Sequence, residues 1–105
     1  MRQLLSVETQ SFVKALASET RQQIMHGFVN GDALTVGEVA EQCGIGQSTA
    51  SEQLAILKLG GLVTSTRAGK QVQYRPDPET IRAHLEALAT YLAGCCPSQA
   101  RDTRA

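Results

Sequence analysis

The fold is decided by the stretch TVGEVAEQCGIGQSTASEQL, residues 35–54. Thr35 and Glu38 have the spacing of a capping box, in which each side chain bonds the other residue's backbone at a helix start. The box predicts a short helix that continues to about Gln42. A Gly-Ile-Gly turn ends this helix, and a second helix runs from residue 47 to about residue 59, before a pair of glycines. The stretch therefore predicts a helix-turn-helix.

Two short extended runs follow the second of these helices, at residues 62–67 and 71–75. Gly69 lies at the tip of the connection, and Val72 and Tyr74 alternate with polar residues, which predicts a β-hairpin. A helix-turn-helix followed by a hairpin is the layout of a winged helix-turn-helix. We therefore expect a mainly α-helical domain with a small β-hairpin, in the order α-α-α-α-β-β-α.

Further helices are predicted on both sides of this unit. Apolar residues at helical spacing predict a first helix over residues 4–17. Ser18 is placed to cap a second helix over residues 19–29. Asp77, followed by proline, predicts the start of the last helix, which runs to about residue 93 or 94.

The chain of 105 residues is the length of one domain. We expect that domain over residues 1–97, because Pro97 prevents the last helix from continuing, and a flexible polar tail over 98–105. No stretch reaches the roughly 18–20 apolar residues of a membrane span, and the N-terminus lacks a signal-peptide pattern. These features predict a cytoplasmic protein that is not in a membrane.

The formal net charge is zero, but the basic residues are concentrated in the middle of the chain. Residues 47–75 hold four basic residues and one acidic residue, whereas residues 1–46 and 76–105 are both net acidic. The basic segment coincides with the second helix of the pair and the hairpin. This distribution is compatible with a nucleic-acid partner in a chain of zero total charge.

Side chains that can reach phosphates or base edges lie at the start of the second helix of the pair. The hairpin adds two cations near its tip. The residues predicted to contact double-stranded DNA are Gln47, Ser48, Thr49, Ser51, Glu52, Gln53, Arg67, Lys70 and Gln71.

The first and last helices carry more apolar surface than a single small winged head covers. A second copy of the chain would cover this surface. The interface residues of the predicted homodimer are Leu4, Phe12, Leu16, Leu85, Leu88 and Leu92. The alternative is that the two faces pack on each other within one chain.

Five motifs in this order resemble the arsenical-resistance and metalloregulatory repressors, the ArsR/SmtB family. They are LASETR at 16–21, VGEVA at 36–40, GQSTASEQL at 46–54, LKLGGLV at 57–63 and GKQVQYR at 69–75. The resemblance covers about residues 12–93. It implies a homodimer, with the first and last helices at the interface, that binds an operator and leaves it when an inducer binds. Glu52 stands where many relatives have His or Gln, and an acid there can accept from a cytosine amino group.

Two inducer sites of the relatives are not implied for this chain. Many relatives that respond to soft metals carry Cys-Val-Cys-Asp where this chain has Thr-Val-Gly-Glu at 35–38. Zinc-responsive relatives carry Asp-x-His and a second His-x2-acid on the last helix. These positions hold Arg82, His84, Cys95 and Ser98 here, so we expect His84 to be an interface residue.

Cys95 and Cys96 are adjacent, and Gly94 and Pro97 on either side are expected to break the helix and let both thiols turn to one side. Two soft thiolates held together select soft ions, foremost trivalent arsenic or antimony. Some arsenite-responsive relatives have such a pair, with a third Cys shortly after it. The third ligand here would be Cys43, a small-molecule thiol or water. No resident cofactor is required.

The alternative function is a thiol-based redox or reactive-sulfur sensor of the same fold, and another soft metal is a further one. Relatives that sense reactive sulfur use one Cys on the second helix, where this chain has His26. An enzyme is not predicted, because no catalytic triad, phosphate loop or carboxylate pair is present. A dimerising adaptor without DNA binding would carry acids over residues 47–53, and Glu52 alone is acidic there.

Overall fold

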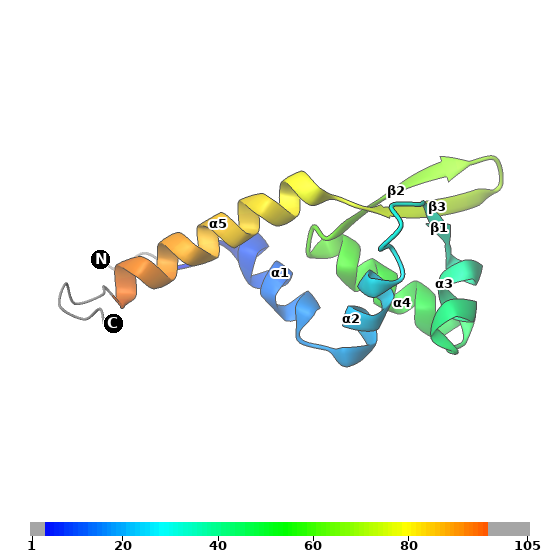
Figure 1. The fold of residues 1–105 in the computed structure, drawn as a ribbon, viewed down its shortest axis with the longest axis horizontal. Helices are drawn as coiled ribbons and strands as arrows, with labels where there is room; N and C mark the ends of the chain where they lie inside the picture. Colours follow the sequence, from blue (N-terminus) through cyan, green and yellow to red (C-terminus); the bar gives the residue numbers. More distant parts are fainter. Residues whose placement is uncertain (1–3, 97–105) are drawn as a thin grey trace.

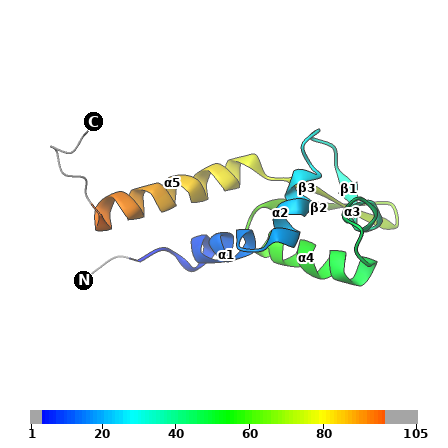
Figure 2. The same cartoon turned by 60° about the horizontal axis from the view of Figure 1, so that its bottom comes forward.

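The computed structural model describes residues 4–96, and these form five helices and a three-stranded sheet. A head of helices and sheet lies at one end, and the first and last helices extend side by side from it (Figures 1 and 2). The elements are α1 (Val7–Leu16), α2 (Glu19–His26), β1 (Leu34–Thr35), α3 (Val36–Cys43), α4 (Gln47–Leu59), β2 (Val63–Ala68), β3 (Gln71–Pro76) and α5 (Pro78–Cys95).

The helix starts follow from side-chain caps. The capping box of Thr35 and Glu38 is present, with Thr35 N–H donating to Glu38 Oε1 at 2.8 Å. Ser18 caps α2 and Asp77 caps α5, as predicted. α1 begins at Val7 and not at residue 4 as predicted, because Ser6 is its cap and accepts from the backbone of the third residue of the helix.

One predicted helix end is wrong, and another is one residue early. α2 ends at His26, and residues 27–30 form turns where the prediction continued the helix to residue 29. α5 continues through Gly94 to Cys95, past the predicted break. A single glycine costs a helix only about 1 kcal/mol, so it does not by itself end one.

The sheet contains one strand more than the predicted hairpin. The strand order is β1-β3-β2, and all neighbours are antiparallel. Leu34 in β1 and Ser65 in β2 both pair with Tyr74 in β3. Gly69, with φ +65°, supplies the left-handed conformation of the two-residue hairpin turn. The winged helix-turn-helix architecture is confirmed, with this short strand added.

The core is mainly aliphatic, with two phenylalanines, Phe12 and Phe28, and lies mainly between α1, α2, α3, α4 and the sheet. Its largest fully buried side chains are Phe12, Ile24, Val39, Leu54, Leu57 and Val63. Phe12 is only 1% exposed, so its assignment to a dimer interface is wrong: the ring is a core residue of its own chain. Leu16, half-buried, packs against the same core and is likewise partly covered within the chain.

α5 is different, because none of its side chains is buried. Leu85 and Leu92 are each 50% exposed, Leu88 is half-buried, and Leu4 in the segment before α1 is 66% exposed. An apolar flank of α5 therefore remains uncovered in the single chain. Within residues 4–96, no helix combines the length and apolar character that crossing a membrane requires.

Candidate DNA interface and thiol site

The start of α4 presents polar side chains to solvent. Gln47, Ser48, Thr49, Ser51 and Glu52 are all exposed. Gly46 precedes the helix and provides no side-chain cap, and the first turn contains no acidic residue. The first amides of α4 are thus not bonded by a cap side chain and point out of a helix N-terminus, an arrangement that suits a phosphate.

Gln53 differs from the other predicted DNA contacts on α4. It is half-buried, and its Oε1 accepts a hydrogen bond from Arg21 Nη1 at 2.7 Å. Its carbonyl oxygen is therefore engaged inside the protein. Sequence reasoning missed Arg21, which lies in a motif at the start of α2 but gives no local sign of the residue it bonds.

The hairpin places its predicted contacts at the end that projects from the head (Figure 1). All three side chains are exposed: Arg67 lies near the end of β2, Lys70 in the turn and Gln71 at the start of β3. Lys58, a further residue that sequence reasoning missed, donates from the last turn of α4 to Ser65 Oγ at 2.8 Å and so joins α4 to β2.

A groove of about 310 Å³ brings the two parts of the predicted interface together. Gln47 at the start of α4 and Gln71 at the start of β3 both line it. The remaining lining comes from the start of α3 and from Val72. The start of α4 and the start of β3, next to the hairpin turn, therefore line one groove.

The thiol pair lies at the other end of the molecule. Cys95 is the last residue of α5, and Cys96 is its C-cap, with φ −135° and ψ 66°. This non-helical conformation turns the second thiol towards the first, so the two Sγ atoms lie 3.5 Å apart. The predicted convergence is thus present, although the helix ends at the cysteines and not at Gly94. Both side chains are exposed.

The hydrogen bond with Cys96 raises the pKa of the Cys95 thiol above its ordinary value, and desolvation adds to this in the same direction. The thiol form of Cys95 is therefore favoured at neutral pH. An ion that binds the sulfur must displace the proton.

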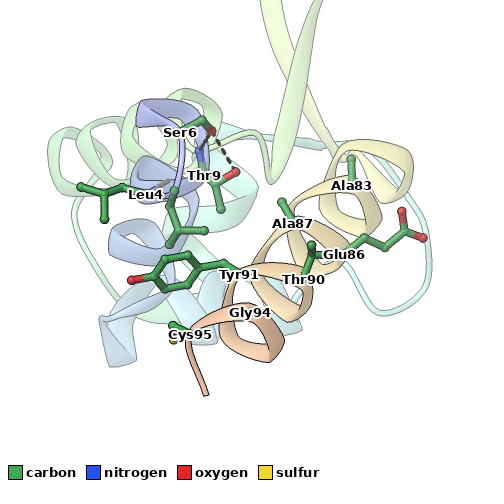
Figure 3. Close-up of a pocket in the computed structure, with 11 residues that line it drawn as sticks. Leu4, Ser6, Thr9, Ala83, Glu86, Ala87, Thr90, Tyr91, Gly94 and Cys95 are labelled. Carbon is green, nitrogen blue, oxygen red and sulfur yellow. Dashed lines mark hydrogen bonds between the residues drawn. The ribbon is translucent and has the colours of Figure 1, made fainter. Parts of the chain in front are cut away.

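A groove of about 1060 Å³ runs between α5 and the segment that leads into α1, with Cys95 in its lining (Figure 3). Tyr91 extends from α5 towards Leu4, while Glu86 points away (Figure 3). The other lining residues are Leu5, Ser6, Thr9, Ala83, Ala87, Thr90 and Gly94. Cys95, one member of the thiol pair, thus borders a partly apolar groove.

The structure does not bring the other candidate ligands to the pair. Cys43 ends α3, at the opposite end of the long axis from the end of α5 (Figure 1). It packs against the core, and burial raises the pKa of its thiol. His84 bonds Thr9 and stacks on Phe12. In the described part of the chain, no three His, Cys, Asp or Glu residues are grouped to hold a metal ion. Ser98 and the tail lie outside the described residues.

The comparisons with known proteins agree with this architecture. A family model described as a helix-turn-helix domain matches residues 16–66. The "Biofilm growth-associated repressor" of Xylella fastidiosa strain Temecula1 is 38% identical over 83 residues, which cover 79% of this chain and 72% of the relative. The solution structure of Mb0332 from Mycobacterium bovis, a homodimeric winged helix-turn-helix DNA-binding domain and possible ArsR-family regulator, aligns with a TM-score of 0.65. This chain belongs to the ArsR family.

The relatives of this ArsR-family chain are DNA-binding regulators and not enzymes. The Mb0332 solution structure shares 26% identity and covers 93% of this chain and 88% of that one. The crystal structure of the transcriptional repressor BigR from Xylella fastidiosa aligns with a TM-score of 0.60 at 33% identity, covering 88% of this chain and 89% of that one.

Proposed function

We propose that this ArsR-family chain is a homodimeric transcriptional repressor that leaves its operator when a thiophilic inducer binds Cys95 and Cys96. The observation that carries the proposal is the separation of 3.5 Å between two exposed sulfurs at the free end of α5. The DNA-binding surface, the dimer contact and the inducer each have their own support.

DNA binding is supported by the surface formed by α4 and the hairpin. Its uncapped helix start suits a phosphate, and its exposed Gln and Ser side chains suit base edges. Arg67 and Lys70 lie on the projecting hairpin, where they can reach the backbone of the same duplex. The relative from Xylella is named a repressor, which favours repression as the outcome of binding.

Dimerisation is supported by the open apolar flank of α5. Leu85 and Leu92 are half-exposed on a helix without any buried side chain, and Leu4 adds to this surface. A second copy would cover it. Mb0332 is homodimeric with the same fold. Two copies place two α4 helices on one DNA, which requires a fixed distance between them.

The inducer favoured by two soft thiolates held together is trivalent arsenic or antimony. Two sulfurs bound to one ion at about 2.3 Å, with an angle of about 100–109°, are about 3.5–3.8 Å apart. The pair already has this separation. Arsenous acid, As(OH)₃, would lose two hydroxyls as water with the two thiol protons and form two As–S bonds. The third hydroxyl, or a small-molecule thiol, then completes the coordination.

Release follows if the occupied pair changes how α5 sits in the dimer. An ion on both sulfurs fixes the C-cap of α5, next to the flank that packs on the second copy. Operator affinity falls if the ion binds more tightly to the arrangement in which the two α4 helices do not match the operator. A coupling of about 1–3 kcal/mol, or about 5–150-fold in affinity, is typical.

The experiment is a titration of the purified chain on its own upstream DNA, followed by addition of arsenite, antimonite, cadmium, zinc, polysulfide or peroxide. Release by arsenite or antimonite at concentrations where zinc has no effect supports the proposal. Release by polysulfide or peroxide alone would support the redox alternative. If none of the compounds changes binding, the thiol pair is not an inducer site.

A further inference from the structure

Arg21 lies where three helices meet. Its backbone N–H, in the first turn of α2, donates to Ser18 Oγ at 3.2 Å. Its guanidinium donates to two carbonyls at the end of α1, from Nε to Ala15 at 2.7 Å and from Nη2 to Lys14 at 3.2 Å. Nη1 donates to Gln53 Oε1 in α4 at 2.7 Å. One side chain therefore joins the end of α1 to the helix proposed to read DNA.

The position of the Arg21 guanidinium is fixed by α1. Carbonyls in the last turn of a helix have no partner in that helix, and the helix dipole favours a cation there. The guanidinium is planar and donates in fixed directions, so bonding α1 also fixes where Nη1 points. Arg21 is half-buried, which reduces competition from water. Gln53 thus bonds a donor that is already held in place.

Gln53 lies on α4 between a buried face and an exposed face. Ala50, Leu54 and Leu57 are fully buried in the core, whereas Glu52 is exposed. A bond on the flank between these faces resists rotation of α4 about its axis. Such rotation would redirect the exposed residues at the start of the helix.

α1 is itself held to α5. Thr9 Oγ1 lies 3.0 Å from His84 Nδ1, and the Phe12 and His84 rings stack with their centroids 4.9 Å apart. Direct contacts therefore extend from α5 through α1 and Arg21 to Gln53 in α4.

We infer that Arg21 is a positioning residue for DNA binding: its bond to Gln53 sets the orientation of α4 relative to α1, and Gln53 acts through Arg21 instead of reading a base. The inference rests on the proposed DNA binding by α4. It gives Gln53 a different role from that of the exposed residues before it on the helix.

The test compares Arg21→Met, Gln53→Met and the double variant by fluorescence anisotropy, on the chain's own upstream DNA and on random-sequence DNA. Each single variant lowers operator affinity about tenfold, a typical effect of a bond to a charged group, and changes random-sequence binding little. The double variant is no weaker than Arg21→Met, because Arg21→Met already removes the bond to Gln53. In a set of operators that each carry one changed base pair, Gln53→Met ranks the operators in the same order of affinity as the wild-type protein does.

Gln22→Met is the matched control. Gln22 Nε2 donates to Leu16 O at 2.7 Å from an exposed position on α2, so its loss affects the end of α1 and leaves the Arg21–Gln53 bond in place. It keeps wild-type operator affinity. If Arg21→Met does not fold, Gln53→Met, which removes only the acceptor, carries the test.

Three results would overturn the inference: wild-type operator affinity in Gln53→Met, additive losses in the double variant, or a changed preference at one base pair. An equal loss in Gln22→Met would show a capping role alone. Failure of the wild-type chain to bind its upstream DNA would instead contradict the proposed function.

Discussion

Thr9 on α1 bonds His84 on α5: Thr9 Oγ1 lies 3.0 Å from Nδ1 of the ring. Thr9 is buried, and the ring also stacks on Phe12 of the core. The space around the ring is tight, because a Cβ added at Gly61 would lie 3.2 Å from His84 Nε2. These contacts fasten α5 to the head of the molecule at a residue near the start of the helix.

Replacing Thr9 by Val tests this attachment. The variant keeps the shape of the side chain and removes the hydroxyl, so a half-buried ring nitrogen loses its partner. We expect the free energy of unfolding to fall by about 1–3 kcal/mol in urea denaturation. Thr64→Val, at an exposed position on β2, is the control and changes it by less than about 0.5 kcal/mol. Equal effects of the two changes would refute a structural role for the Thr9 hydroxyl.

Leu85→Asp tests the dimer contact. A charge on the half-exposed flank of α5 has to be buried when a second copy packs there, at a cost of several kcal/mol. We expect sedimentation to show a folded monomer at micromolar concentration. Val29→Asp, at a position 73% exposed in the turn after α2, is the control and remains dimeric. A stable wild-type monomer, or a dimer unaffected by Leu85→Asp, would count against the proposed interface.

Local signals made much of the fold predictable. The caps at Ser18, Thr35 and Asp77 act on neighbouring backbone, so a few residues are enough to place the starts of α2, α3 and α5. The bounds of α4 are as predicted, because glycines flank it on both sides. These signals do not depend on the rest of the fold.

Apart from a few helix ends, the errors concern interactions between distant parts of the chain. β1 is two residues long, too short for an alternating pattern, and exists through its pairing with β3. The helical spacing of Phe12 shows that its face is apolar, but not whether the core or a second copy covers it. Gln53 is polar and near a helix start, yet Arg21, 32 residues away, takes up its oxygen.

Arg67→Ala and Lys70→Ala test the contribution of the hairpin to DNA binding. Each variant weakens binding to all DNA sequences. A protein that contacts one phosphate fewer releases fewer counterions from the DNA when it binds. The slope of log affinity against log salt falls by about one for each lost contact. Lys14→Ala, a matched loss of one charge on α1, leaves the slope unchanged. An unchanged slope in the hairpin variants would mean that the hairpin does not contact phosphate.

The pH dependence of release distinguishes the two kinds of thiophilic inducer. The bond with Cys96 raises the pKa of Cys95, so a cation such as Cd²⁺ must displace protons and binds more weakly as pH falls. With two protons released on binding, log affinity rises by up to about 2 per pH unit. Arsenous acid releases water and no net proton, so its profile is nearly flat between about pH 6 and 8. Cys43→Ser leaves both profiles unchanged; a flat cadmium profile would contradict this account.

We propose that Cys95 and Cys96 together form the inducer site. The most direct measurement is the affinity of the Cys95→Ser/Cys96→Ser double variant for the chain's own upstream DNA, with and without arsenite. We predict wild-type affinity without arsenite and no release on adding it, whereas wild-type and Cys43→Ser proteins lose about 5–150-fold in affinity. Normal release of the double variant by arsenite would contradict the claim.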